Sequence, residues 1–339
     1  MNRRATSDDV AKRAGVSRTA VSLVLNGHGA GNIAPATQEA IRRAARELAY
    51  TPNSAARSLR SRRTQTIGVV TDAIATSAFG GGQLAGAIDV AREAGYLLLV
   101  LDTHSDDERG HPAFDLLQAR QVDGLMFAAK DMRAYRAPAA MRQLPSVMTN
   151  SFEPDNAVTG ICCDEEAGGR AAAQLLLDNG HRDITMISGT GDEIATQLRR
   201  RGYLAALEAA GLPPAPPIPG GWTIRDGYRA GREALTRPDR PTGLVCPNDR
   251  AAAGVLLAAR DLGIDVPGDL SVVGYDDDEN VAAVIVPALT TVAIPHEAMG
   301  SEGMRRLLAL IDGAESEPER VVVPCPVVIR ESVATAPSC

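Results

Sequence analysis

The stretch TSDDVAKRAGVSRTAVSLVLN, residues 6–26, predicts two short amphipathic helices joined by a tight turn. Thr6 and Asp9 have the Ser/Thr-x-x-Asp/Glu spacing of a capping box, which starts the first helix. Gly15 ends that helix, and the second helix spans Ser17 to Asn26. Its apolar side chains share one face, namely Val21, Val24 and Leu25. This spacing is typical of a helix-turn-helix.

A third helix is expected from about Pro35, so that three helices share one small core in residues 1–50. Its apolar residues recur at helical spacing: Ile41, Ala44, Ala45 and Leu48. The polar residues of the second helix lie largely away from its apolar face: Arg18, Thr19, Ser22 and Asn26. Such side chains can hydrogen-bond base edges or phosphates, although a lone amphipathic helix with this pattern would only be solvated.

The charge of the chain is distributed unevenly. Residues 1–63 hold 12 Lys or Arg and 4 Asp or Glu, a net charge of +8. The whole chain has a net charge of −7, so the remaining residues carry −15. A basic segment on an acidic protein favours contact with a polyanion such as nucleic acid.

The head resembles the lactose/galactose repressor family. The matching stretches are Thr6–Ala11, Ala14–Ser17, Ala20–Ser22, Val24–Asn26 and Tyr50–Asn53. The resemblance implies that the second helix enters the major groove of operator DNA, and that a hinge after the third helix enters the minor groove. The positions it implies for DNA contact are Ser17, Arg18, Thr19 and Ser22 in the groove, with Asn26 and Thr6 nearer phosphates.

Two features of the head depart from the family pattern. Leu23 stands where many members carry arginine, and it exchanges a hydrogen bond for apolar contact with a thymine methyl group. The loop at residues 27–32 is longer and richer in glycine. Both departures affect which operator is preferred, and neither argues against DNA binding.

Residues 51–65 are expected to form a hinge helix and linker. Asn53 is a good cap, but the helix spans barely two turns and is marginal in water unless it is bound. The resemblance implies that Leu59 wedges between base pairs in the minor groove, with Ala56 packing beside it.

Residues 66–339 alternate short apolar runs with helical segments, which predicts two doubly wound lobes with parallel sheets. The runs expected as strands buried on both faces are 67–70, 96–100, 124–127, 147–148, 184–187, 243–246 and 271–275. The stretches resembling the family's core, which is shared with periplasmic sugar-binding proteins, are 199–203, 247–249, 271–277 and 328–332. The fold class is therefore a small all-α head plus a periplasmic-binding-protein-like α/β core. The N-lobe covers about 66–162 and 293–325, and the C-lobe about 163–292 and 326–339.

Ligands of such sheets bind beyond the carboxyl ends of the strands, in the cleft between facing lobes. Polar residues follow expected strands at Asp72, Asn150, Asn248 and Asp276. By resemblance, the effector-contacting residues are Arg199, Asn248 and Asp276, with Asn150, Trp222 and Phe79 at less strict positions. A carboxylate accepts from vicinal hydroxyls, an arginine fork donates to two oxygens, and an aromatic face stacks on a sugar ring. The alternatives are an Arg199–Asp276 structural bridge and a Phe79 that only fills the core.

These features predict a transcription regulator, most simply a repressor of carbohydrate-metabolism genes that a sugar-like effector releases from DNA. A purine or another metabolite is the alternative effector. A chain with 3% aromatic residues offers little surface for stacking a base, although a stack on Phe79 together with Arg199 and Asp276 could hold one. A solute-binding protein without regulatory work is a further alternative, and it would have no need of the head.

An enzyme is not expected, and neither is a cofactor or a bound metal. The sequence has no GxSxG, P-loop or metal-ligand cluster, and its five histidines are scattered. The five cysteines lack CxxC spacing and are interpreted as small buried hydrophobes. No apolar run reaches the roughly 18 residues of a membrane helix, and acidic residues precede any apolar run at the N-terminus, which is unlike a secretory signal. We therefore expect a cytoplasmic protein associated with the nucleoid and not with a membrane.

A homodimer on a roughly palindromic operator is expected, because one helix-turn-helix contacts only a half-site. The chain reaches Cys339 without a heptad-bearing tail, which favours a dimer over a tetramer assembled by a coiled coil.

Overall fold

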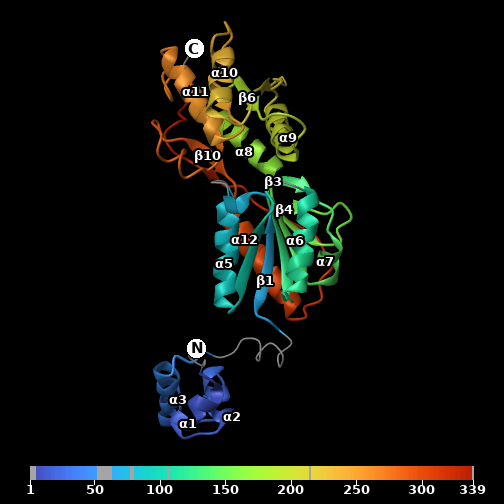
Figure 1. Ribbon diagram of the computed structural model, residues 1–339. Coiled ribbons are helices and arrows are strands. Elements are labelled where there is room, and N and C mark those ends of the chain that lie inside the picture. The colour runs from blue at the N-terminus through green and yellow to red at the C-terminus, as the bar shows by residue number, and fades with distance from the viewer. Residues whose placement is uncertain (1–4, 52–62, 77–79, 105–106, 214, 338–339) are drawn as a thin grey trace. The chain divides into compact units, whose positions relative to one another are not determined.

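The computed structural model describes residues 5–51, 63–76, 80–104, 107–213 and 215–337 (Figure 1). The chain divides into two compact units, residues 1–64 and residues 65–339, which we call the head and the body. Four predicted contact residues lie outside the described residues: Asn53, Ala56, Leu59 and Phe79.

The head consists of three helices around one apolar core. They are α1 (Ser7–Ala14), α2 (Arg18–Leu25) and α3 (Pro35–Glu47). The predicted capping box is present, since Thr6 Oγ1 accepts from the Asp9 amide and the Asp9 carboxylate accepts from the Thr6 amide. Gly15 closes α1 in the left-handed conformation at φ 68°. The core side chains come from all three helices: Val10, Ala11, Ala20, Val21, Val24, Ile41, Ala44 and Ala45.

The first sheet of the body, in the N-lobe, is entirely parallel, with the order β11-β5-β4-β3-β1-β2. Its strands are β1 (Thr66–Thr71), β2 (Leu97–Asp102), β3 (Gly124–Ala134), β4 (Ser146–Phe152), β5 (Thr159–Cys163) and β11 (Arg320–Val323). The helices of this lobe are η1 (Ile74–Thr76), α5 (Gly81–Glu93), α6 (Asp107–Ala119), α7 (Ala139–Gln143) and α12 (His296–Ile311). Met126 of β3 packs in the same cluster as α5 and α12, and Phe127 packs with α6 and α7. Adjacent side chains of the strand therefore face opposite helical layers.

The second sheet, in the C-lobe, has the order β12-β10-β9-β8-β6-β7, and only β12 is antiparallel to its neighbour. Its strands are β6 (Ile184–Ser188), β7 (Ile218–Pro219), β8 (Gly243–Val245), β9 (Ser271–Asp276), β10 (Thr290–Ala293) and β12 (Val327–Val328). Its helices are α8 (Glu165–Asp178), α9 (Ile194–Ala209), α10 (Ile224–Leu235) and α11 (Asp249–Asp261). Val245 packs in the cluster of α8 and α9, whereas Leu244 packs with α10 and α11.

The chain passes between the two sheets after β5, after β10 and after β11. Three connections therefore join the lobes, and the second of them leads from β10 into α12, which packs against the first sheet. The expected fold class is confirmed: an all-α head and a core of two doubly wound lobes with parallel sheets.

The prediction that the run 96–100 forms a strand buried on both faces is wrong. This run contributes β2, whose Leu97 is 61% exposed and whose Leu99 and Val100 are each 36% exposed. The reason is position: β2 lies at the edge of its sheet and pairs only with β1. An apolar run specifies a strand, but it does not specify whether other chain covers that strand.

Candidate functional site

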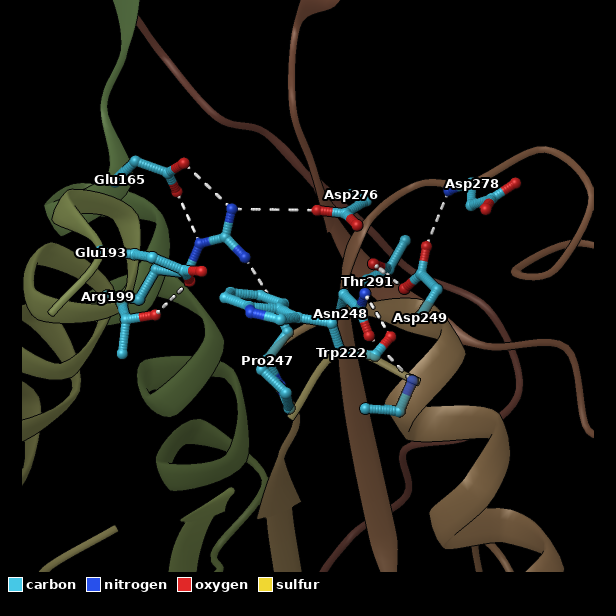
Figure 2. Close-up of polar contacts among 12 residues, drawn as sticks. Glu165, Glu193, Arg199, Trp222, Pro247, Asn248, Asp249, Asp276, Asp278 and Thr291 are labelled. Carbon is cyan, nitrogen blue, oxygen red and sulfur yellow. Dashed lines mark hydrogen bonds and ion pairs between the residues drawn. The ribbon is translucent and has the colours of Figure 1, made fainter. Parts of the chain in front are cut away.

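Arg199 of α9 is the most completely bonded cation of the C-lobe site (Figure 2). Its Nε lies 2.7 Å from Glu165 Oε2 and its Nη2 lies 3.0 Å from Glu165 Oε1, so the pair is bidentate. Nη1 donates to the Pro247 carbonyl oxygen at 2.6 Å, and the guanidinium carbon lies 3.6 Å from the centroid of the Tyr275 ring. The arginine fork is therefore held in one orientation by three partners.

Glu165 is a site residue that the sequence analysis missed. It lies in the first turn of α8, directly after β5, and its side chain is 2% exposed. Burial acts to raise the pKa of Glu165, but the charge and hydrogen bonds of Arg199 outweigh it and hold that pKa below the usual range. The neighbouring Glu166 instead pairs with Arg201 at the surface. No local signal in the sequence distinguishes these two glutamates.

Asp276, at the end of β9, is the second acid near Arg199. Its Oδ1 lies 3.8 Å from Arg199 Nη2, which is farther than either Glu165 oxygen. Burial raises the pKa of Asp276 well above its usual value, and Arg199 offsets only part of that effect. The Arg199–Asp276 bridge considered as an alternative is therefore present, but it is weaker than the Arg199–Glu165 pair. A ligand hydroxyl would find in Asp276 an acceptor that is not held bidentately.

Trp222 and Asn248 lie beside this group (Figure 2). The Trp222 ring covers Gly189, where an added Cβ atom would lie 2.2 Å from the ring, and its centroid is 5.9 Å from the Arg199 guanidinium carbon. Asn248 caps α11, because its Oδ1 accepts from the Ala251 amide at 2.8 Å. Its Nδ2 donates to the Trp222 carbonyl oxygen at 3.1 Å. Asn248 thus positions the helix and the tryptophan, with one amide hydrogen left for other partners.

The N-lobe side of the site is organised around two consecutive residues of β3, Ala129 and Lys130. Asp72 Oδ1 accepts from the Lys130 amide at 2.7 Å, and Asn150 Nδ2 donates to the Lys130 carbonyl at 2.9 Å. Gln83, which the sequence analysis also missed, donates to the Ala129 carbonyl at 3.0 Å. Because a backbone carbonyl can only accept, the two bonds fix the orientation of the side-chain amides of Asn150 and Gln83. Among the described residues, Asn150 Oδ1 and Gln83 Oε1 are buried acceptors without a hydrogen-bond partner.

His296, the first residue of α12, lies close to Gln83 of the N-lobe and within electrostatic range of Glu165 and Arg199 of the C-lobe. Its Nδ1 lies 3.5 Å from Gln83 Nε2. Burial lowers the pKa of His296 to about 4, while Glu165 acts to raise it and Arg199 to lower it. The imidazole is therefore neutral at neutral pH, and it lies within electrostatic reach of the C-lobe pair.

Asp249, the first residue of α11, bonds to β10 and to the loop after β9 (Figure 2). It is fully buried, accepts from Thr291 Oγ1 of β10 at 2.6 Å, and accepts from the Asp278 amide at 2.7 Å. Burial raises the pKa of Asp249 to about 7, although both hydrogen bonds act to lower it. Asp249 therefore holds α11, β10 and the loop after β9 together.

Of the predicted effector residues, the structure groups four in the C-lobe: Arg199, Trp222, Asn248 and Asp276. Asp72 and Asn150 instead meet at Lys130 in the N-lobe. In the part of the chain described, no cluster of three or more His, Cys, Asp or Glu side chains is suited to a metal ion.

The candidate DNA-binding surface of the head lies around the start of α2. Ser17, Arg18 and Thr19 are exposed, and Ser17 Oγ caps the helix by accepting from the Ala20 amide at 3.2 Å. Asn26 Nδ2 donates to the Ser22 carbonyl at 2.7 Å and lies 3.1 Å from Ser22 Oγ, so this pair is partly engaged within the helix.

Thr6 is also engaged, because its hydroxyl donates to the Asp9 carboxylate at 2.7 Å. Arg18 Nε lies 3.5 Å from Asp8 Oδ1, with both side chains more than half exposed. Such an exposed pair is weak and exchanges readily for a phosphate. Across the described residues, no helix is long and apolar enough to cross a membrane.

Comparisons with known proteins match both units of the chain. Residues 6–53 match the family model of bacterial regulatory proteins, lacI family, and residues 173–333 match that of a periplasmic binding protein-like domain. The HTH-type transcriptional repressor PurR of Erwinia tasmaniensis is 33% identical over 98% of both chains.

Two solved structures are similar over nearly the whole chain. The lac repressor dimer bound to operator and the anti-inducer ONPF has a TM-score of 0.79 at 28% identity, covering 98% of this chain and 100% of that one. The complex of the transcriptional regulator CelR with cellobiose has a TM-score of 0.67 at 32% identity, covering 97% of this chain and 100% of that one.

Proposed function

Because the chain belongs to the lacI family of bacterial regulatory proteins and is a DNA-binding transcription regulator, we propose that it is a repressor controlled by a sugar-like effector. The effector binds between the two lobes of the body and releases the head from the operators of carbohydrate-metabolism genes. The observation that carries this proposal is the grouping of Trp222 with Arg199 and Asp276.

The chemistry of this group suits a sugar ring. Trp222 is half-buried, so part of its ring is available to stack on the apolar face of a pyranose. Asp276 can accept from hydroxyls, and Asn150 Oδ1 and Gln83 Oε1 are further acceptors on the N-lobe side. The similarity to CelR, solved with cellobiose, supports the same class of ligand.

A purine is the alternative effector, and the similarity to a PurR repressor favours it. A purine base is held best between aromatic faces. The second aromatic ring near Arg199 is Tyr275, which is 1% exposed and has the guanidinium stacked on it at 3.6 Å. Among the described residues this leaves Trp222 as the stacking surface, and Phe79, the other aromatic residue predicted for the pocket, lies outside them.

For the head, we propose that Ser17, Arg18, Thr19 and Ser22 contact the major groove and that Thr6 and Asn26 lie nearer phosphates. Exposure of Arg18 and Thr19 supports this assignment. The head would end at residue 50 and the hinge would span 51–65, with Leu59 wedged in the minor groove, Ala56 packing beside it and Asn53 also contacting DNA.

We also propose a homodimer, assembled through apolar surfaces on both lobes. In the N-lobe, the β2 edge and Ile88 of α5 are exposed. In the C-lobe, four large apolar residues are 47–92% exposed around the start of α10 and the side of α11: Ile224, Leu257, Val284 and Val286. Three of them, Ile224, Leu257 and Val286, line a hollow of about 720 Å³. Apolar surface of this extent is typical of a protein interface.

The effector would act by shifting the angle between the lobes. Three chain connections join them, so a ligand held by both lobes can favour one arrangement over another. The shift can be no larger than the ligand's differential affinity for the two states.

The test is a mobility shift on DNA upstream of the protein's own gene, with Trp222 fluorescence followed in parallel. The panel includes cellobiose, glucose, galactose, ribose, hypoxanthine and guanine. We expect one sugar to change both signals and to weaken DNA binding. Binding of hypoxanthine or guanine without binding of any sugar would contradict the sugar assignment and support the alternative.

A further inference from the structure

We infer that the effector site accepts uncharged ligands and rejects anionic ones such as sugar acids, because Glu165 already neutralises Arg199, the buried cation of the C-lobe side. The inference rests on the proposed sugar effector, and it narrows the class of sugar. Glu165 is the positioning residue: by pairing with Arg199 it determines whether a charged or an uncharged ligand is favoured at Arg199.

The geometry of Arg199 carries the first step. Three of its five N–H donors are used, two by Glu165 at 2.7 and 3.0 Å and one by the Pro247 carbonyl at 2.6 Å. The side chains of Arg199 and Glu165 are 5% and 2% exposed, so water screens the pair little. A ligand carboxylate that reached the remaining N–H groups of Arg199 would therefore meet a cation whose charge Glu165 already offsets, and it would itself lie close to the Glu165 carboxylate.

The other cations near the site are also balanced. Arg133 Nη2 lies 3.6 Å from Asp72 Oδ2, and Lys130 Nζ lies 3.6 Å from Asp131 Oδ2. His296 is neutral at neutral pH because burial lowers its pKa to about 4. Arg133 and Lys130 therefore each have an acidic neighbour, and the Lys130–Asp131 pair is the weaker of the two because it is more exposed.

The remaining ionisable groups of the site are acids. Asp276 approaches Arg199 at 3.8 Å but shares it with Glu165, and Asp249 is fully buried behind the site. The acceptors Asn150 Oδ1 and Gln83 Oε1 add partial negative charge. An anion placed here would meet these acids and acceptor oxygens, whereas a ligand hydroxyl could donate to them.

The first experiment compares each neutral sugar with its uronate, which keeps the ring and replaces one hydroxymethyl group with a carboxylate. Glucose with glucuronate and galactose with galacturonate are titrated against the full-length protein, with Trp222 fluorescence as the signal. We expect the neutral sugar of a binding pair to be favoured at least ~10-fold. A uronate that binds as tightly as its sugar would overturn the inference while leaving the sugar effector standing.

The second experiment needs no knowledge of the effector, because inorganic phosphate is the probe. Wild-type protein should show no saturable Trp222 response to phosphate, and Glu165→Gln should show one because it frees part of the Arg199 charge. Glu166→Gln is the matched control: it removes the same charge one residue away, from the surface pair with Arg201. It should behave as wild type.

The two experiments separate the two ideas. If no sugar or uronate binds, the proposed effector is wrong, and the phosphate titration still decides the charge inference. A saturable phosphate response in the wild-type protein would overturn that inference, and this arm does not depend on whether Glu165→Gln folds. Equal phosphate responses of folded Glu165→Gln and Glu166→Gln would also overturn it.

Discussion

Replacing Arg199 with methionine should destabilise the body strongly, because it leaves Glu165 buried without its partner. Methionine keeps much of the side-chain volume but removes the bidentate pair at 2.7 and 3.0 Å and the bond to the Pro247 carbonyl. Breaking a buried pair from one side costs about 3–5 kcal/mol of unfolding free energy. The matched control is Arg201→Met on the same helix, whose partner Glu166 is at the surface. That variant should unfold like the wild type.

The loss should depend on pH with a defined sign. In the wild type the pKa of Glu165 lies below its usual value, so its stabilising contribution is present at neutral pH and is lost as the pH falls. In Arg199→Met, Arg199 no longer offsets the effect of burial, which raises the pKa of Glu165, so the folded variant takes up a proton more readily than the unfolded chain. The difference between the two proteins should therefore shrink from about pH 8 to about pH 5.

The assay is urea unfolding followed by far-UV circular dichroism, at one protein concentration and at both pH values. Circular dichroism is preferred to fluorescence because Trp222 lies 5.9 Å from the substituted group. The reasoning would be refuted by an Arg199→Met variant as stable as Arg201→Met, or by a difference from wild type that grows as the pH falls.

Three further predictions concern other parts of the molecule. Ile41→Ala empties part of the fully buried core of the head and should cost about 2–5 kcal/mol, seen as loss of operator binding in a mobility shift; unchanged binding would contradict it. Leu99→Lys on the exposed β2 edge should convert dimers to monomers in sedimentation, and a stable dimer would count against that interface. Asp249 has a pKa of about 7 instead of the usual 3.8, so the wild type should lose stability as the pH rises through this interval. In urea unfolding Asp249→Asn should have a smaller slope, with the rest contributed by Asp276, whose pKa burial also raises; an equal slope would exclude Asp249 as a source.

The parts of the fold that could be predicted from the sequence depend on neighbouring residues. The capping box of Thr6 and Asp9 spans three residues, and Pro35 lies in the first turn of α3, so both helix starts are encoded locally. The strands could likewise be predicted from their runs of apolar residues. The edge position of β2 could not be predicted, because the burial of Leu97 depends on which strand lies next to it in the sheet.

The site shows the same division between local and distant contacts. Glu165 and Arg199 are 34 residues apart, and Gln83 and Ala129 are 46 apart, so nothing in their immediate sequence pairs them. Asn248 is the instructive case, because asparagine directly before a helix is a local capping signal. Asn248 is predicted from the sequence only as an effector contact, whereas in the structure its Oδ1 accepts a hydrogen bond from the Ala251 amide and caps α11.

The central claim, that a sugar bound in the body controls operator binding by the head, is tested most directly by measuring the coupling in both directions. Labelled operator DNA is titrated with and without the sugar that changes Trp222 fluorescence, and the sugar is titrated with and without saturating operator. We predict that the sugar weakens DNA binding and that DNA weakens sugar binding by the same factor, as linkage requires. A sugar that binds at Trp222 with the same affinity whether or not the operator is bound would contradict the account.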